Sequence, residues 1–141
     1  MKKTTLLLLV LIVIACSPKV ITSGEKPLYE VLTRQNNGGA SIRFYEILTE
    51  PKEIKMLQND DNLKKKINAE DIKTANFVIL NMGEKNSGGY SINVKSVIEA
   101  ADKIIITVEE SAPKRNEMAT SVISYPYTIV KVNSKKPIVI Q

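Results

Sequence analysis

The sequence contains no histidine, and Cys16 is its only cysteine. Without histidine the chain cannot form Ser-His-Asp or Cys-His nucleophile pairs, nor the usual zinc sites that use this residue. Carboxylates, lysines, tyrosines and hydroxyls leave a Ser-Lys dyad or a pair of acids as the enzymatic alternatives, but no spacing singles out such a pair. We therefore expect a protein that is not an enzyme and that needs no metal or cofactor.

The sequence also lacks a strong basic cluster. The formal net charge is +5, and Lys2 and Lys3 belong to a segment that we expect to be removed. Lys64 to Lys66 form the only lysine run, and no aromatic residue lies near it, so we predict no nucleic-acid partner. The Asn59 to Asn62 cluster lacks the alternating ligands, central glycine and distal glutamate of a calcium loop, which predicts a solvated helix end instead.

Residues 1–15 have the parts of a secretory signal peptide: a basic start, an apolar run from Leu6 to Ala15, and a small residue before Cys16. At ~1.5 Å per residue the run covers only about half of a ~30 Å hydrocarbon core, which argues against a membrane-spanning helix. The segment Val13 to Cys16 resembles the lipobox of bacterial lipoproteins, where cleavage leaves the cysteine as a lipidated N-terminus. The alternative is a free or buried thiol after an ordinary signal peptide.

The lipobox resemblance implies an anchor in the bacterial cell envelope, outside the cytoplasm. Several acyl chains on Cys16, at ~0.8 kcal/mol per buried methylene, would hold the protein on a membrane that the sequence does not identify. Residues 16–27 contain Pro18, Gly24 and Pro27 and little apolar content, which predicts a flexible tether. The remaining residues, 28–141, have the length of one ordinary domain.

Periodicity predicts an α+β fold that is mostly β: a small antiparallel sheet or sandwich with one or two short helices. Strands are expected in residues 28–33, 42–48, 77–82, 90–97, 104–110, 127–132 and 137–140. A helix capped by Thr49 should run to about Gln58, with a weaker turn in residues 62–68. Residues 96–103 could instead form a capped helix, but we favour a bent strand and a turn.

A glycine-marked segment, residues 83–94, lies between the apolar run 77–82 and an alternating run that starts at Tyr90. Its length and its adjacent Gly88 and Gly89 predict a β-hairpin between the two runs. Tyr90 shares a strand face with Ile92, so we expect its ring to pack on the core. Tyr125, which precedes Pro126, and Tyr127 should point the same way, either onto the sheet or outward.

The segment from residue 77 to 133 resembles the C-terminal domain of the protease complex subunit PrcB family. That family has a Gly-x-Lys-x-Thr-Gly-Gly-Tyr-x-Ile segment, a Val-x-Glu-x-x-Pro loop and a Pro-Tyr-x-Ile-Val-Lys strand. The matching residues here are Gly83, Lys85, Gly88, Gly89, Tyr90, Ile92, Val108, Glu110, Pro113, Pro126, Tyr127, Ile129, Val130 and Lys131. Ser87 stands in place of the threonine and keeps its hydroxyl.

The resemblance implies a secreted or lipid-anchored protein that is not an enzyme. The family is named for a subunit that accompanies and stabilises an extracellular subtilisin-like protease. We predict that Gly88, Gly89, Tyr90, Pro126 and Tyr127 are structural. The hypothetical partner-binding residues are Glu84, Lys85, Asn86, Ser87, Lys114 and Arg115. Two alternatives stay open: a protease inhibitor similar to chagasin, and a structural envelope lipoprotein with no link to a protease.

Overall fold

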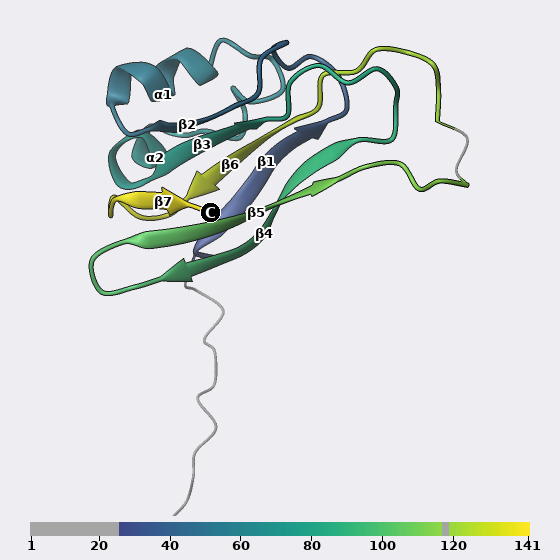
Figure 1. Cartoon of the computed structure of the whole chain (residues 1–141). Coiled ribbons are helices and arrows are strands. Elements are labelled where there is room, and N and C mark those ends of the chain that lie inside the picture. The colour runs from purple at the N-terminus through teal and green to yellow at the C-terminus, as the bar shows by residue number, and fades with distance from the viewer. Residues whose placement is uncertain (1–25, 117–118) are drawn as a thin grey trace, which may run out of the picture.

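The computed structural model describes residues 26–116 and 119–141, which fold into two facing sheets and two short helices (Figure 1). The order of the four-stranded sheet is β1 (Tyr29–Gln35), β6 (Tyr127–Val132), β3 (Asn76–Asn81) and β2 (Phe44–Leu48). The order of the three-stranded sheet is β4 (Ser91–Glu99), β5 (Ile104–Ser111) and β7 (Ile138–Ile140). All pairings are antiparallel except β5 with β7. The predicted fold class is confirmed.

The signal peptide, Cys16 and most of the tether lie outside the described residues, as do Glu117 and Met118. Within the described part of the chain, neither helix is long and apolar enough to cross a membrane. The predictions of a lipidated cysteine and of a cleaved leader therefore remain predictions.

A first core lies between the two sheets. Its fully buried side chains come from β3, β4, β5 and β6 and from the residue after β3: Val78, Leu80, Met82, Ile92, Ile104, Ile106, Val130 and Val132. Tyr90 packs against this cluster from its edge, as its strand face predicts. All eight buried residues belong to the stretch from residue 76 to 133, and partly buried side chains from β1, β2 and β7 pack against them.

A second core lies on the other face of the four-stranded sheet, under the helices α1 (Pro51–Leu57) and α2 (Ala69–Thr74). Phe77 and Ile129 project from the sheet towards buried Ile54 and Ile72 of the helices. β3 is therefore covered on both faces, because Val78 faces one core and its neighbour Phe77 faces the other.

The predicted hairpin between β3 and β4 is wrong. β3 lies inside the four-stranded sheet with β2 on one edge and β6 on the other, so it has no free edge for β4. β4 instead pairs with β5 in the second sheet. Residues 83–90 of the glycine-marked segment therefore carry the chain from one sheet to the other.

The helix boundaries also differ from the prediction. The N-cap of α1 is Glu50, not Thr49, and the carboxylate of Glu53 accepts the backbone N–H groups of both residues at 3.3 Å. The second helix begins after Asn68, whose side-chain oxygen accepts two backbone N–H groups of its first turn at 2.9 Å. Residues 62–66 form turns. Residues 96–99 are strand, as favoured, with a bulge between Val94 and Ser96.

One buried charge cluster joins β6 to α2 and β1. The Lys131 side chain, 10% exposed, faces the helix side of the sheet, and its Nζ lies 3.0 Å from Glu30 Oε2 and 3.6 Å from Asp71 Oδ1. Asp71 is 1% exposed, and its other oxygen accepts the backbone N–H of Asn68 at 3.0 Å. Lys131 therefore compensates a carboxylate that is almost fully removed from water.

Candidate functional site

Three segments far apart in the sequence meet at one end of the sandwich: residues 36–43, residues 83–90, and the connection after β5, of which residues 112–116 and 119–126 are described. We call this region the loop end (Figure 1). Backbone hydrogen bonds join the segments. Lys85 and Ser124 exchange both N–H···O bonds, at 2.8 and 2.9 Å, and Glu84 N–H donates to the carbonyl oxygen of Ser41 at 2.9 Å. The loops at this end are therefore joined to one another by backbone hydrogen bonds of the kind that pair strands in a sheet.

Two glycines bring residues 83–90 close to the long connection that follows β5. A Cβ on Gly88 would lie 2.4 Å from Thr120 Oγ1, and a Cβ on Gly89 would lie 2.8 Å from Pro113 Cβ. Gly89 also has a φ of 86°, whereas Gly88 has a negative φ. The structural role predicted for both residues fits these contacts with residues 83–90, which we call the crossing segment. Lys114 and Arg115, which follow Pro113 in the sequence, are exposed.

Asn81 holds residues 36–43 in place, and the sequence analysis did not predict this role. Its side chain is buried, accepts the backbone N–H of Ala40 at 3.0 Å and donates to the carbonyl oxygens of Ala40 and Ile42. One amide thereby satisfies three backbone groups of a loop that has no strand partner there. The available signal was a polar residue at the end of an otherwise apolar strand.

The four hypothetical binding residues of the crossing segment have different environments. Glu84 and Asn86 are exposed, and Lys85 and Ser87 are half-buried. Lys85 Nζ lies 5.7 Å from the centroid of the Tyr90 ring. The carbonyl oxygen of Ser87 accepts the hydroxyl of Ser124 at 2.7 Å. Lys85 and Ser87 therefore both make contacts within the domain.

Tyr125 and Tyr127 also differ. Tyr127 is half-buried against the helix-side core. The Tyr125 hydroxyl donates to Glu84 Oε2 at 3.0 Å, and this hydrogen bond raises the pKa of Tyr125 above its ordinary value. Pro126 is buried, and its carbonyl oxygen accepts the backbone N–H of Met82 at 2.9 Å. These contacts lie at the base of the loop end and are consistent with the structural role expected of Pro126 and Tyr127.

Exposed apolar side chains mark the surface of the loop end. Ile42 is 74% exposed, Val122 63% and Ile123 51%. They lie on the two segments that border residues 83–85. Fixed apolar side chains at a polar rim are typical of protein-binding surfaces. The sequence prediction did not include these three residues, although a Val-Ile pair among serines and threonines was a signal for Val122 and Ile123.

A polar network joins the two sheets beside this surface. Arg43 Nε donates to Glu110 Oε1 at 2.9 Å, and Tyr45 OH donates to the same oxygen at 3.0 Å. Arg43 also donates to the tyrosine oxygen at 2.6 Å. Burial and, next, the hydrogen bond to Glu110 raise the pKa of Tyr45 above 10.0, and the same glutamate raises the pKa of Arg43.

Because of this network, we expect the free energy of unfolding to decrease at alkaline pH. Because the folded-state pKa of Tyr45 lies above its ordinary value of 10.0, its contribution is complete below that pH and is lost as pH rises through the folded pKa. We expect Tyr45→Phe to reduce the fall in melting temperature above about pH 10. Thermal melts above about pH 10 measure this. The same fall in melting temperature with pH for the variant and the parent would contradict the prediction. Tyr125 and Tyr127, whose pKa values are also raised, should keep part of the slope.

Charged side chains of the loop end make contacts within the domain. Among residues 26–116 and 119–141, no group of three or more Asp, Glu, Cys or His residues could hold a metal ion. Arg43 pairs with Glu110, Glu84 accepts the hydroxyl of Tyr125, and Lys85 lies over the Tyr90 ring. Backbone pairing holds these groups in place, which lowers the entropy cost of binding a partner.

Comparison with known proteins finds a family match for the central part of the chain. Residues 76–133 match the family model described as PrcB C-terminal. The resemblance stated from the sequence is confirmed for this segment, which includes the two inner strands β3 and β6 and the β4–β5 pair. No curated protein and no solved structure matches significantly.

Proposed function

We propose, from the PrcB C-terminal match of residues 76–133, that this chain is a lipid-anchored protein of the bacterial cell envelope that is not an enzyme. In this proposal the loop end binds a protein partner, an extracytoplasmic protease, and serves as its accessory or stabilising subunit. The family resemblance supports the link to a protease. The lipobox-like segment that ends at Cys16 supports the anchor.

The observation that carries the proposal is the construction of the loop end. Backbone bonds between Lys85 and Ser124, and close packing at Gly88 and Gly89, hold residues 83–90 in one shape. Exposed Val122 and Ile123 then project from a fixed base. Such a surface loses little conformational freedom on binding and can bury apolar area at its centre.

Crosslinking in native cells tests the proposal. A photoreactive side chain in place of Asn86, which is exposed, should join the chain to one main product that contains a protease. Replacement of both Val122 and Ile123 by serine should lower the yield by about fivefold or more, because loss of an apolar contact of ~1 kcal/mol or more weakens binding to that extent. The melting temperature should stay near that of the parent, since both side chains are exposed.

The matched control is the same photoreactive side chain at Asp102, an exposed residue of the β4–β5 turn at the opposite end of the sandwich (Figure 1). It should give little of the product. Equal yields from Asn86 and Asp102, or an unchanged yield in the double serine variant, would place the partner elsewhere and contradict the proposal.

The same cells test the anchor. Cys16→Ser removes the thiol that would carry the lipid, so the variant should leave the membrane fraction and should not incorporate labelled palmitate. Retention of Cys16→Ser in the membrane fraction together with unchanged labelling would rule out lipidation at this residue.

Protease inhibition is the second candidate, favoured by the presence of three neighbouring loops at one end of a sandwich. A chagasin-like inhibitor would insert such loops into the active-site cleft of a cysteine protease. Failure of the purified chain to inhibit a small panel of cysteine and serine proteases would exclude this candidate and leave the accessory role untouched.

A further inference from the structure

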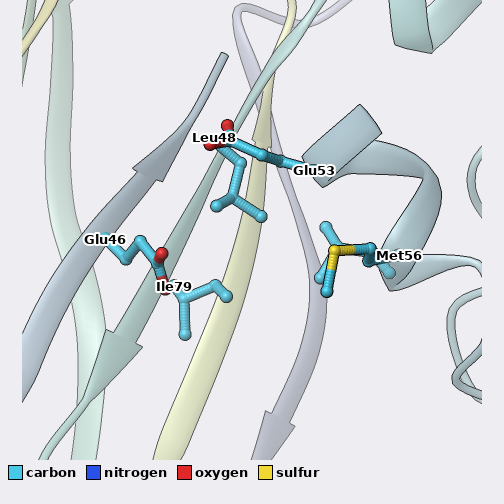
Figure 2. Close-up of a pocket in the computed structure, with 6 residues that line it drawn as sticks. Glu46, Leu48, Glu53, Met56 and Ile79 are labelled. Carbon is cyan, nitrogen blue, oxygen red and sulfur yellow. The ribbon is translucent and has the colours of Figure 1, made fainter. Parts of the chain in front are cut away.

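A small pocket lies away from the loop end, between α1 and the edge of the four-stranded sheet (Figure 2). It is lined by Glu46, Leu48, Glu53, Met56, Leu57 and Ile79. Its volume is about 170 Å³. Pockets for cofactors and drug-sized ligands are larger, roughly 300–1,000 Å³, whereas a cavity of about 150 Å³ holds one benzene molecule. The pocket therefore has the size for a single side chain.

One wall of the pocket is a free strand edge. In the part of the chain that the structure describes, β2 pairs with β3 on one side only and is the outer strand of its sheet. Glu46 and Leu48 of β2 and Ile79 of β3 point to the helix-covered face, where the pocket opens. An outer strand presents unpaired backbone groups that an extended peptide can use, and alternate side chains of such a peptide would project to this face.

The lining is complementary to an aliphatic cation. Leu48, Leu57, Met56 and Ile79 provide apolar walls, Glu46 and Glu53 provide carboxylates, and no lysine or arginine belongs to the lining. The carboxylate of Glu53 is oriented because it accepts the backbone N–H groups of Thr49 and Glu50. A lysine or arginine side chain combines methylenes with a cationic tip, and this pocket can contact both parts.

We propose that the β2 edge and this pocket bind an extended peptide segment of a partner protein, with one lysine or arginine side chain in the pocket. The main chain of the segment adds to β2. The methylenes of its basic residue pack on Leu48 and Ile79, and its cationic tip pairs with Glu46 and Glu53. This site does not depend on the function proposed for the loop end.

Peptide binding to the full-length chain in mild detergent tests the inference. The probe is a fluorescent seven-residue peptide of alternating threonine and valine with lysine at its centre, followed by anisotropy. We expect its affinity to fall by about 3- to 10-fold with Glu46→Gln or Glu53→Gln, because each substitution removes one partly exposed charge partner. Added salt should weaken binding. Glu109→Gln, which changes an exposed carboxylate of β5 outside the pocket, should leave the affinity unchanged.

Matched peptides separate the parts of the inference. Norleucine in place of lysine should weaken binding to a similar extent, and glutamate should abolish it. A single capped lysine, which cannot add a strand, should bind at least about tenfold more weakly than the peptide. Equal affinities for the lysine and norleucine peptides, or full binding by the two glutamine variants, would overturn the basic pocket. Equal affinities for the capped lysine and the peptide would overturn strand addition, and no binding of the lysine peptide would overturn both.

Discussion

Replacement of Lys131 by methionine is expected to destabilise the folded chain by about 3–5 kcal/mol, the usual effect of removing one partner of a buried ion pair. The reason is Asp71, which is 1% exposed and would keep a buried charge with no cation beside it. Methionine fills a volume similar to that of the lysine stem, so packing changes little. Urea unfolding of the two proteins measures the difference.

A double-mutant cycle separates charge from packing. Asp71→Asn retains an oxygen for the backbone N–H of Asn68, and in the Lys131→Met background it should recover most of the loss. Glu30→Gln is the matched control, because that carboxylate is half exposed and its loss should cost less than about 1 kcal/mol. A double variant no more stable than Lys131→Met would show that the cost is not due to the buried charge.

Replacement of Gly89 by alanine is expected to cost about 2 kcal/mol or more. At a φ of 86° an L-residue is strained by roughly 1–2 kcal/mol, and its Cβ would also lie 2.8 Å from Pro113 Cβ. The crossing between the sheets depends on this approach, so crosslinking from Asn86 should decrease as well. Denaturant unfolding gives the stability change.

Gly88→Ala is the comparison, because its obstacle is the Thr120 hydroxyl alone. Thr120→Ala removes that oxygen and leaves the nearest Thr120 atom at 3.7 Å, an ordinary contact distance. Gly88→Ala should therefore cost less than about 0.5 kcal/mol when it is made in Thr120→Ala. Pro113→Gly should relieve only the steric part for Gly89→Ala. Complete rescue of Gly89→Ala by Pro113→Gly would contradict the strain argument.

The strands could be predicted because each one carries its own periodicity. Residues 77–82 are apolar on both faces and lie between two cores, and residues 127–132 were placed without error. The pairing of β3 could not be predicted locally. A hairpin and a crossing between sheets need the same glycines, and the choice depends on β2 and β6, which lie elsewhere in the sequence and occupy both edges of β3.

The short helix α2 was missed for a different reason. Its sequence has little apolar periodicity, and its signal is the cap at Asn68 with Asp71 three residues later. Leu63 and Ile67 led to the prediction of a turn in residues 62–68. Residues 62–66 do form turns and both side chains are buried, but the helix begins only after Asn68.

The sequence could predict individual segments of the candidate site, but not the contacts between segments that lie far apart in the chain. The family pattern located the crossing segment and the loop near Lys114. The sequence carried a signal for Val122 and Ile123 and for Asn81, but not their positions. The structure places the first two next to the residue that pairs with Lys85, and Asn81 against the loop that it supports. The motif residues Gly83, Gly89 and Pro126 occupy tight backbone positions, which indicates that much of the family pattern encodes the crossing.

The position of β1 has a kinetic consequence. Among the described residues, β1 pairs with β6 alone, and its pair Tyr29–Val132 joins residues from the two ends of the domain sequence. Until residues 127–132 have been synthesised, β1 has no strand to pair with and β3 has one unpaired edge. The four-stranded sheet therefore cannot be completed progressively from the N-terminal side, and its closure must wait for the strand that carries Lys131.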